Sequence, residues 1–209
     1  MSEHAHKLKA PDPARAHGAW VYLVISILAG VLTSARFDMS TAFFAGVAFL
    51  GVFVCASSFA NPAARKWGRF AVGCAIIVAC VVAGIATGAD PMFLAYSAIA
   101  VFPAGASAFF ALRHGFQSGP ALAFAVVALV VAAPASACAG GAPHHLGLIL
   151  LGLLAPFFAW RTWCTRQALR SRSGWTRKEL KSLGWREAAL AFGWTALALT
   201  VVHVVGARH

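Results

Sequence analysis

The chain has 209 residues, of which 60% are hydrophobic and 11% are charged, and its formal net charge is +11. Soluble domains carry about 25% charged residues, so this composition excludes an ordinary soluble globular protein and favours one that uses lipid as its solvent. The basic residues are scattered among apolar segments rather than clustered. That distribution argues against a nucleic-acid partner and favours the anionic lipids of the cytoplasmic leaflet.

Residues 1–17 are polar and are expected to form a cytoplasmic tail. Seven apolar segments follow, each long enough to cross the hydrocarbon core as a helix rising about 1.5 Å per residue. They cover residues 18–34, 41–60, 70–88, 91–112, 120–139, 146–163 and 188–206. Because backbone groups in hydrocarbon must pair internally, these segments are expected to be helical. The sequence therefore predicts an all-α, polytopic membrane helix bundle of about seven transmembrane helices.

Three regions follow the polar tail in this prediction. Residues 18–163 form a six-helix transmembrane region, residues 164–186 form a basic cytoplasmic or interfacial loop, and residues 187–209 form the seventh helix with a short outer tail. Within 164–186, Thr176 and Glu179 have the spacing of a capping box, and Gly184 is a residue that can end a helix. We expect a short helix there, lying at the membrane interface, although a basic loop that only sets topology is an equal alternative.

Prolines mark two helix starts and three predicted kinks. Pro91 and Pro120 open the fourth and fifth segments, where the missing N–H costs nothing. Pro103, Pro134 and Pro156 lie inside segments, where each removes a backbone hydrogen bond and is expected to bend its helix.

The distribution of basic residues predicts the orientation of the bundle. If the N-terminus is cytoplasmic and the helices alternate, the outer segments hold only Arg36 and Arg208. All other basic residues then fall on the cytoplasmic side, which is a strong positive-inside bias. These are Lys7, Lys9, Arg15, Arg65, Lys66, Arg69, Arg113, Arg161, Arg166, Arg170, Arg172, Arg177, Lys178, Lys181 and Arg186. We therefore predict an N-in, C-out membrane protein.

Polar side chains near the predicted inner boundary are the main candidates for a functional site. Charged groups at this depth are costly unless they are paired or face a cavity. Glu187 is the one acid at a helix start on this face, so Arg113, Arg161 or Arg186 is its expected partner. One interpretation is a shallow polar pocket for an anionic headgroup or substrate, and the favoured one is a set of helix ends anchored by snorkelling charges. The candidates are His17, Trp20, Asn61, Arg113, His114, Arg161 and Glu187.

A second group of candidates lies on the predicted outer face. His144 and His145 open the sixth segment, His203 is near the outer end of the seventh, and Cys138 ends the fifth. Imidazoles from different helices can bind haem or a metal, but adjacent histidines point about 100° apart on a helix. The five cysteines of the chain include no CxxC pair, which argues against a disulfide framework. We expect no metal site and no cofactor.

The run from His17 to Trp20 reads HGAW, follows Pro13 and Arg15, and leads directly into the first membrane segment. This motif resembles the opening of the YwiC-like family of bacterial membrane proteins. The stretch from Lys181 to Glu187 and the run Phe59-Ala60-Asn61-Pro62 resemble further segments of that family. The family usually has a glutamate before the HGAW histidine, whereas this chain has Ala16. The resemblance implies a multi-pass inner-membrane protein and carries no established activity.

Three functions compete at this stage. The first is a non-catalytic membrane protein of YwiC-like type that binds lipid or assists the subunits of a membrane complex. The second is an isoprenoid enzyme like the UbiA-type prenyltransferases, which hold magnesium with acidic motifs after the second and sixth helices. Here residues 61–65 contain no aspartate and the later loop holds only Glu179 and Glu187, so magnesium-dependent transfer is not expected. The third is a small-solute transporter, which usually needs a charge in mid-membrane.

Overall fold

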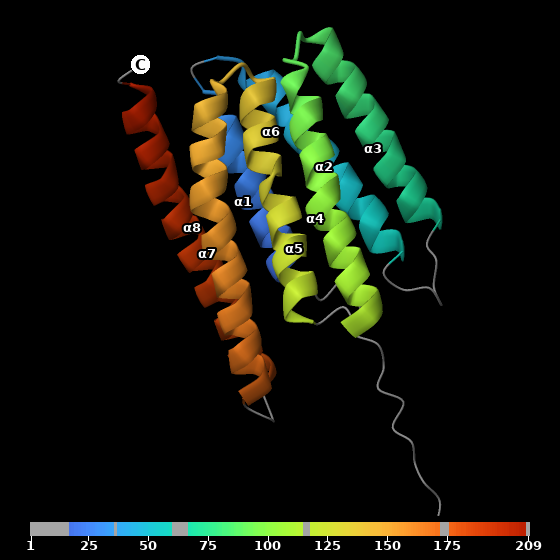
Figure 1. Ribbon diagram of the computed structural model, residues 1–209, viewed down its shortest axis with the longest axis vertical. Coiled ribbons are helices and arrows are strands. Elements are labelled where there is room, and N and C mark those ends of the chain that lie inside the picture. The colour runs from blue at the N-terminus through green and yellow to red at the C-terminus, as the bar shows by residue number, and fades with distance from the viewer. Residues whose placement is uncertain (1–16, 36, 60–66, 115–117, 172–175, 208–209) are drawn as a thin grey trace, which may run out of the picture.

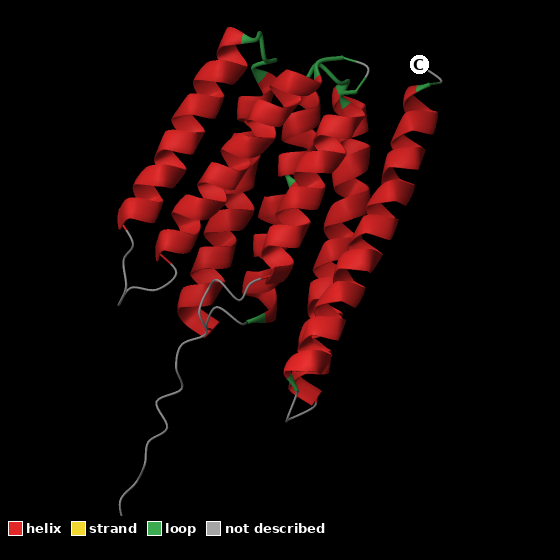
Figure 2. Cartoon of the chain, turned by 180° about the vertical axis from the view of Figure 1, so that it is seen from behind, coloured by secondary structure: helices red, strands yellow, loops and turns green. Residues whose placement is uncertain are grey.

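The computed structural model describes residues 17–35, 37–59, 67–114, 118–171 and 176–207, and every regular element in these ranges is an α-helix (Figure 2). The helices are α1 (His17–Thr33), α2 (Met39–Phe59), α3 (Trp67–Ala86), α4 (Met92–His114), α5 (Gly119–Val130), α6 (Ala132–Ala139), α7 (His144–Ser171) and α8 (Arg177–Gly206). The predicted all-α bundle is confirmed. Six stretches are long and apolar enough to cross a membrane, with α5 and α6 forming one of them, and the apolar part of α1, Ala19–Thr33, is shorter.

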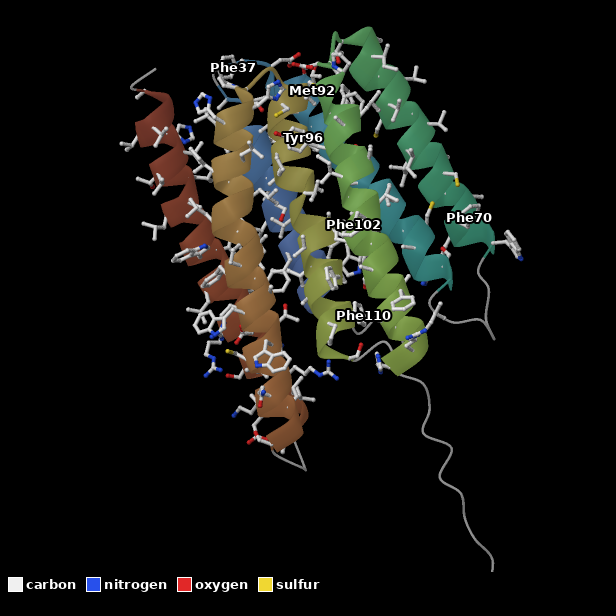
Figure 3. All side chains as sticks on the ribbon, in the orientation of Figure 1. Phe37, Phe70, Met92, Tyr96, Phe102 and Phe110 are labelled. Atoms are coloured by element: carbon white, nitrogen blue, oxygen red, sulfur yellow. The ribbon has the colours of Figure 1, made fainter. Side chains whose placement is uncertain are left out.

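Successive spans run in opposite directions, so the helix ends gather at two ends of the bundle (Figure 1). We call one of them the basic end: there α2, α4 and α7 finish and α3, α5 and α8 begin. In Figure 3, Phe110 marks the side of the basic end, while Phe37 and Met92 lie at the opposite end. This antiparallel order follows from connections too short for a crossover.

The short helix α6 occupies the centre of the bundle. All eight of its residues are buried, and it contacts α1, α2, α4 and α7. Its sequence, AAPASACA, contains only small side chains, which let neighbouring backbones approach closely. At Gly30 of α1, an added Cβ atom would lie 2.4 Å from the carbonyl oxygen of Ala133. The packing around α6 therefore depends on close backbone contact, whereas the neighbouring core also contains large side chains such as Phe158, Leu150 and Leu154.

The fifth predicted span is interrupted at a single residue, Val131, which itself keeps right-handed helical dihedral angles (φ −58°, ψ −21°). α5 ends at Val130 and α6 starts at Ala132, so the break at Val131 lies three residues before Pro134. Pro134 has no N–H to donate to the carbonyl of Val130, and its ring crowds that carbonyl. Pro103 and Pro156 have the same chemistry, yet α4 and α7 run through them without interruption.

The prediction of a separate short helix between the last two spans is wrong. α7 continues through Cys164 to Ser171, and α8 begins at Arg177 and passes Gly184 without a break. The predicted capping box is present, because Thr176 Oγ1 accepts a hydrogen bond from the Glu179 N–H and the Glu179 carboxylate accepts one from the Thr176 N–H. With 28 and 30 residues, α7 and α8 are about 42 and 45 Å long and exceed a hydrocarbon core of about 30 Å. Their ends extend beyond the other helices at the basic end (Figure 1).

Candidate functional site

The basic end gathers the cations of the bundle. Every Lys and Arg side chain that the structure describes lies there: Arg69, Arg113, Arg161, Arg166, Lys178, Lys181 and Arg186. The side chains of Trp67, Trp160, Trp163 and Trp185 are exposed in the same zone. Exposed tryptophans next to basic residues are typical of the boundary between hydrocarbon and headgroups. This end therefore has the composition of a membrane interface.

Two long helices supply most of these groups. We call residues 160–171 of α7 together with residues 176–187 at the start of α8 the basic hairpin. On α8, Lys178, Lys181 and Trp185 are spaced to share one face, and all three are exposed. Leu183 and Glu187 lie on the opposite face and are buried or partly buried. The start of α8 therefore exposes its cations on one face and buries side chains on the other.

The guanidinium of Arg161 on α7 is paired with the carboxylate of Glu187 on α8. Arg161 Nε donates to Glu187 Oε2 at 3.0 Å and Arg161 Nη2 donates to Glu187 Oε1 at 2.5 Å. The two side chains are 15% and 12% exposed. Arg186 Nη2 lies 3.8 Å from Glu187 Oε1, but its side chain is 66% exposed. Of the three partners expected for Glu187, Arg161 is therefore the principal one.

Aromatic packing fixes the helices that carry this ion pair. The ring of Phe157 stacks on Trp194 of α8 with centroids 4.6 Å apart, and Trp194 Nε1 donates to the carbonyl oxygen of Leu153 at 2.9 Å. The next ring, Phe158, stacks on Tyr22 of α1, also at 4.6 Å. Arg161 lies one helical turn beyond Phe157, so this packing holds its side chain on the seam between α7 and α8.

The other predicted site residues whose side chains the structure describes do not join this pair. Trp20 packs edge to face on Phe53 of α2 with centroids 4.6 Å apart. At the end of α4, the Arg113 guanidinium lies 4.8 Å from the centroid of Phe109, and His114 stacks on Phe110. Both side chains are exposed. Asn61 and the side chain of His17 lie outside the described part of the chain. The predicted constellation is therefore divided among several helices.

A small cleft between α5 and α7 was not predicted from the sequence. It has a volume of about 20 Å³ and is lined by Gly119, Leu122, Ala123, Ala159, Thr162, Trp163 and Arg166. An added Cβ atom at Gly119 would lie 2.6 Å from Trp163 Cζ3, so the glycine makes room for the indole. The cleft has room for about one water molecule rather than for a substrate.

At the opposite end, the predicted histidine group is also dispersed. Cys138 Sγ lies 3.3 Å from His144 Nδ1, while His203 Nδ1 lies 2.8 Å from the carbonyl oxygen of Leu199 on its own helix. Among the described residues no three His, Cys, Asp or Glu side chains are placed to share a metal ion. Two aspartates act at helix starts on this face: Asp38 accepts from Thr41 N–H, and Asp90 accepts from Met92 N–H.

No protein-family model, no curated protein and no solved structure matches this chain.

Proposed function

We propose that this chain is a multi-pass protein of the bacterial inner membrane, of YwiC-like type, with its N-terminus and basic end in the cytoplasm and its C-terminus outside. The charge distribution supports the orientation, because cations are retained on the cytoplasmic side of membrane helices. The length and hydropathy of the spans support the membrane location. The family assignment rests on the HGAW run from His17 to Trp20.

In this proposal the protein is a non-catalytic accessory that binds anionic phospholipid headgroups through the basic hairpin. One observation carries it: Lys178, Lys181 and Trp185 are exposed on a single face of α8, beyond the length needed to cross the membrane. Each Lys or Arg near an anionic surface contributes about 1 kcal/mol of binding free energy. The tryptophan anchors the same face at headgroup depth.

Lipid retention tests this function. The protein is purified in mild detergent, offered equal amounts of phosphatidylglycerol and phosphatidylcholine, and analysed by native mass spectrometry for bound lipid and for associated membrane subunits. The wild type is expected to retain phosphatidylglycerol preferentially. The double variant Lys178→Gln/Lys181→Gln should lose about tenfold or more of that preference, since two cations contribute about 2 kcal/mol.

A matched control uses a cation at the same end of the bundle but outside the hairpin. Arg113→Gln removes a single guanidinium that lies over Phe109 of its own helix, and it should change the preference by about fivefold at most, less than the double variant does. Equal retention of both lipids by the wild type would overturn the proposed function. An equal loss in the control would assign binding to net charge rather than to the hairpin.

A further inference from the structure

The seam between α2 and α3 is a close helix crossing at the edge of the bundle. Gly51 and Gly73 face each other there: an added Cβ atom at Gly51 would lie 2.9 Å from the carbonyl oxygen of Gly73, and one at Gly73 would lie 2.8 Å from that of Gly51. The two backbones are therefore in direct contact. Such an approach is possible only where neither helix carries a side chain at the crossing point.

Two cysteines flank this crossing. Cys55 lies one helical turn after Gly51, and Cys74 directly follows Gly73. Their Sγ atoms are 3.8 Å apart, and the Cys55 thiol also donates to the carbonyl oxygen of Phe70 at 3.5 Å. A disulfide has an S–S distance of about 2.05 Å and joins Cα atoms about 4.4–6.8 Å apart. The two sulfur atoms must therefore approach each other by a further ~1.8 Å.

The position of the pair determines what kind of molecule reaches it. Both thiols are partly exposed on the surface of the bundle, whereas Cys138 is fully buried. Cys74 lies seven residues after Trp67, which places it about 10 Å along the helix from the basic end. Phe70 marks this part of α3, which stands at the edge of the bundle and packs mainly on α2 (Figure 3). An oxidant that meets these thiols from the lipid must itself be lipid-soluble.

We propose that Cys55 and Cys74 form a redox-active dithiol that a membrane quinone converts to a disulfide between α2 and α3. The two S–H bonds break and one S–S bond forms. The two electrons and two protons reduce the quinone to its hydroquinone. A membrane-permeant dithiol reverses the step by exchange. The disulfide covalently fastens the edge helix α3 to the rest of the bundle. This inference is independent of lipid binding by the basic hairpin.

Thiol counting on the purified protein in lipid nanodiscs tests the proposal. The probe is duroquinone, a fully substituted quinone that accepts electrons but has no free ring position for thiol addition. After treatment the protein is denatured, its free thiols are labelled with a maleimide, and the peptides are mapped by mass spectrometry. Two of the five cysteines should become unreactive, Cys55 and Cys74 should appear in one linked peptide, and dithiothreitol should restore both.

Matched variants use two cysteines of the same helix. Cys80 lies six residues after Cys74, about 120° away around the axis of α3, and Cys80→Ala should leave the loss of two thiols unchanged. Cys74→Ala should abolish it. The wild type alone can overturn the proposal. It does so if all five thiols remain free after treatment, or if the linked peptide contains a cysteine other than Cys55 and Cys74. If copper phenanthroline links Cys55 to Cys74 but duroquinone does not, the quinone reaction is overturned.

Discussion

Arg161 and Glu187 join α7 to α8 by two hydrogen bonds, one from each of two guanidinium nitrogens to a different carboxylate oxygen. The pair lies one turn beyond the stacked rings of Phe157 and Trp194. A bidentate arginine–carboxylate pair fixes both distance and orientation. This contact therefore sets the geometry of the basic hairpin that the proposed function requires.

The first prediction concerns that ion pair. Glu187→Gln should lower the free energy of unfolding by about 2 kcal/mol, less than the 3–5 kcal/mol of a fully buried pair because both side chains keep some exposure. Arg186→Gln is the control, since the Arg186 side chain is 66% exposed and 3.8 Å from the carboxylate. It should change stability by less than about 0.5 kcal/mol. Titration with SDS in a mild detergent measures both, and equal effects would contradict the assignment of Arg161 as the principal partner.

The close packing around α6 gives a second prediction. Gly30→Ala places a methyl group 2.4 Å from the carbonyl oxygen of Ala133 and 2.7 Å from Ser136 Cβ. Overpacking of this kind should cost about 1–3 kcal/mol and lower the thermal unfolding midpoint. Gly152→Ala is the matched control, because nothing lies within 4 Å of an added Cβ there. It should be neutral or slightly stabilising, since alanine favours a helix over glycine. The packing account fails if both variants behave alike.

The third prediction follows from the acid at the start of α2. Hydrogen bonds from Ser40 and Thr41 lower the pKa of Asp38 from 3.8 to about 2. A depressed pKa in the folded state contributes stability above the unfolded value, and this contribution is lost as pH falls toward the folded value. The difference in unfolding midpoint between wild type and Asp38→Ala should stay constant from pH 7 to about pH 4 and shrink toward pH 2. A difference that grows on acidification would contradict the hydrogen-bond explanation.

A fourth prediction addresses the capping box at the start of α8. Thr176→Ala removes the acceptor of the Glu179 N–H and should cost about 1 kcal/mol locally. Amide hydrogen exchange in the first turn of α8 should then accelerate about fivefold, with little change beyond Glu187. Ser182→Ala, at an exposed position inside the same helix, should leave the exchange pattern unchanged. If exchange in the Thr176 variant is unaltered, the capping box does not stabilise the first turn of α8, and packing alone does.

Periodic and local signals in the sequence predicted much of the fold. Apolar runs located the spans because every backbone group in a membrane must pair within its own helix. The spacing of Thr176 and Glu179 predicted a helix start there because a capping box is a contact between near neighbours in sequence, but the helix that begins there is α8 and not the short one expected. Glu187 was identified as the one acid at a helix start on its face, with three arginines as candidate partners. The structure selects Arg161 among them.

Contacts that depend on helix rotation and order could not be predicted in this way. Cys55 and Cys74 meet because Gly51 and Gly73 permit one particular crossing, which spacing alone does not reveal. Arg113 and His114 lie against aromatic rings of α4, away from the ion pair of α7 and α8, because the order of helices around the bundle separates them. The low helix propensity of Gly184 led us to expect a helix end there. α8 nevertheless continues through this residue, because helix formers lie on both sides of it.

The orientation of the basic end is the central claim, and labelling of added cysteines tests it most directly. Ala35→Cys and Ser171→Cys place a thiol at exposed positions at opposite ends of the bundle. A membrane-impermeant maleimide is applied to spheroplasts and to inverted vesicles, with the wild type as background. We predict labelling of the Ala35 variant in spheroplasts and of the Ser171 variant in inverted vesicles. The reverse pattern, or labelling of both variants from the same side, would contradict an N-in bundle whose basic end faces the cytoplasm.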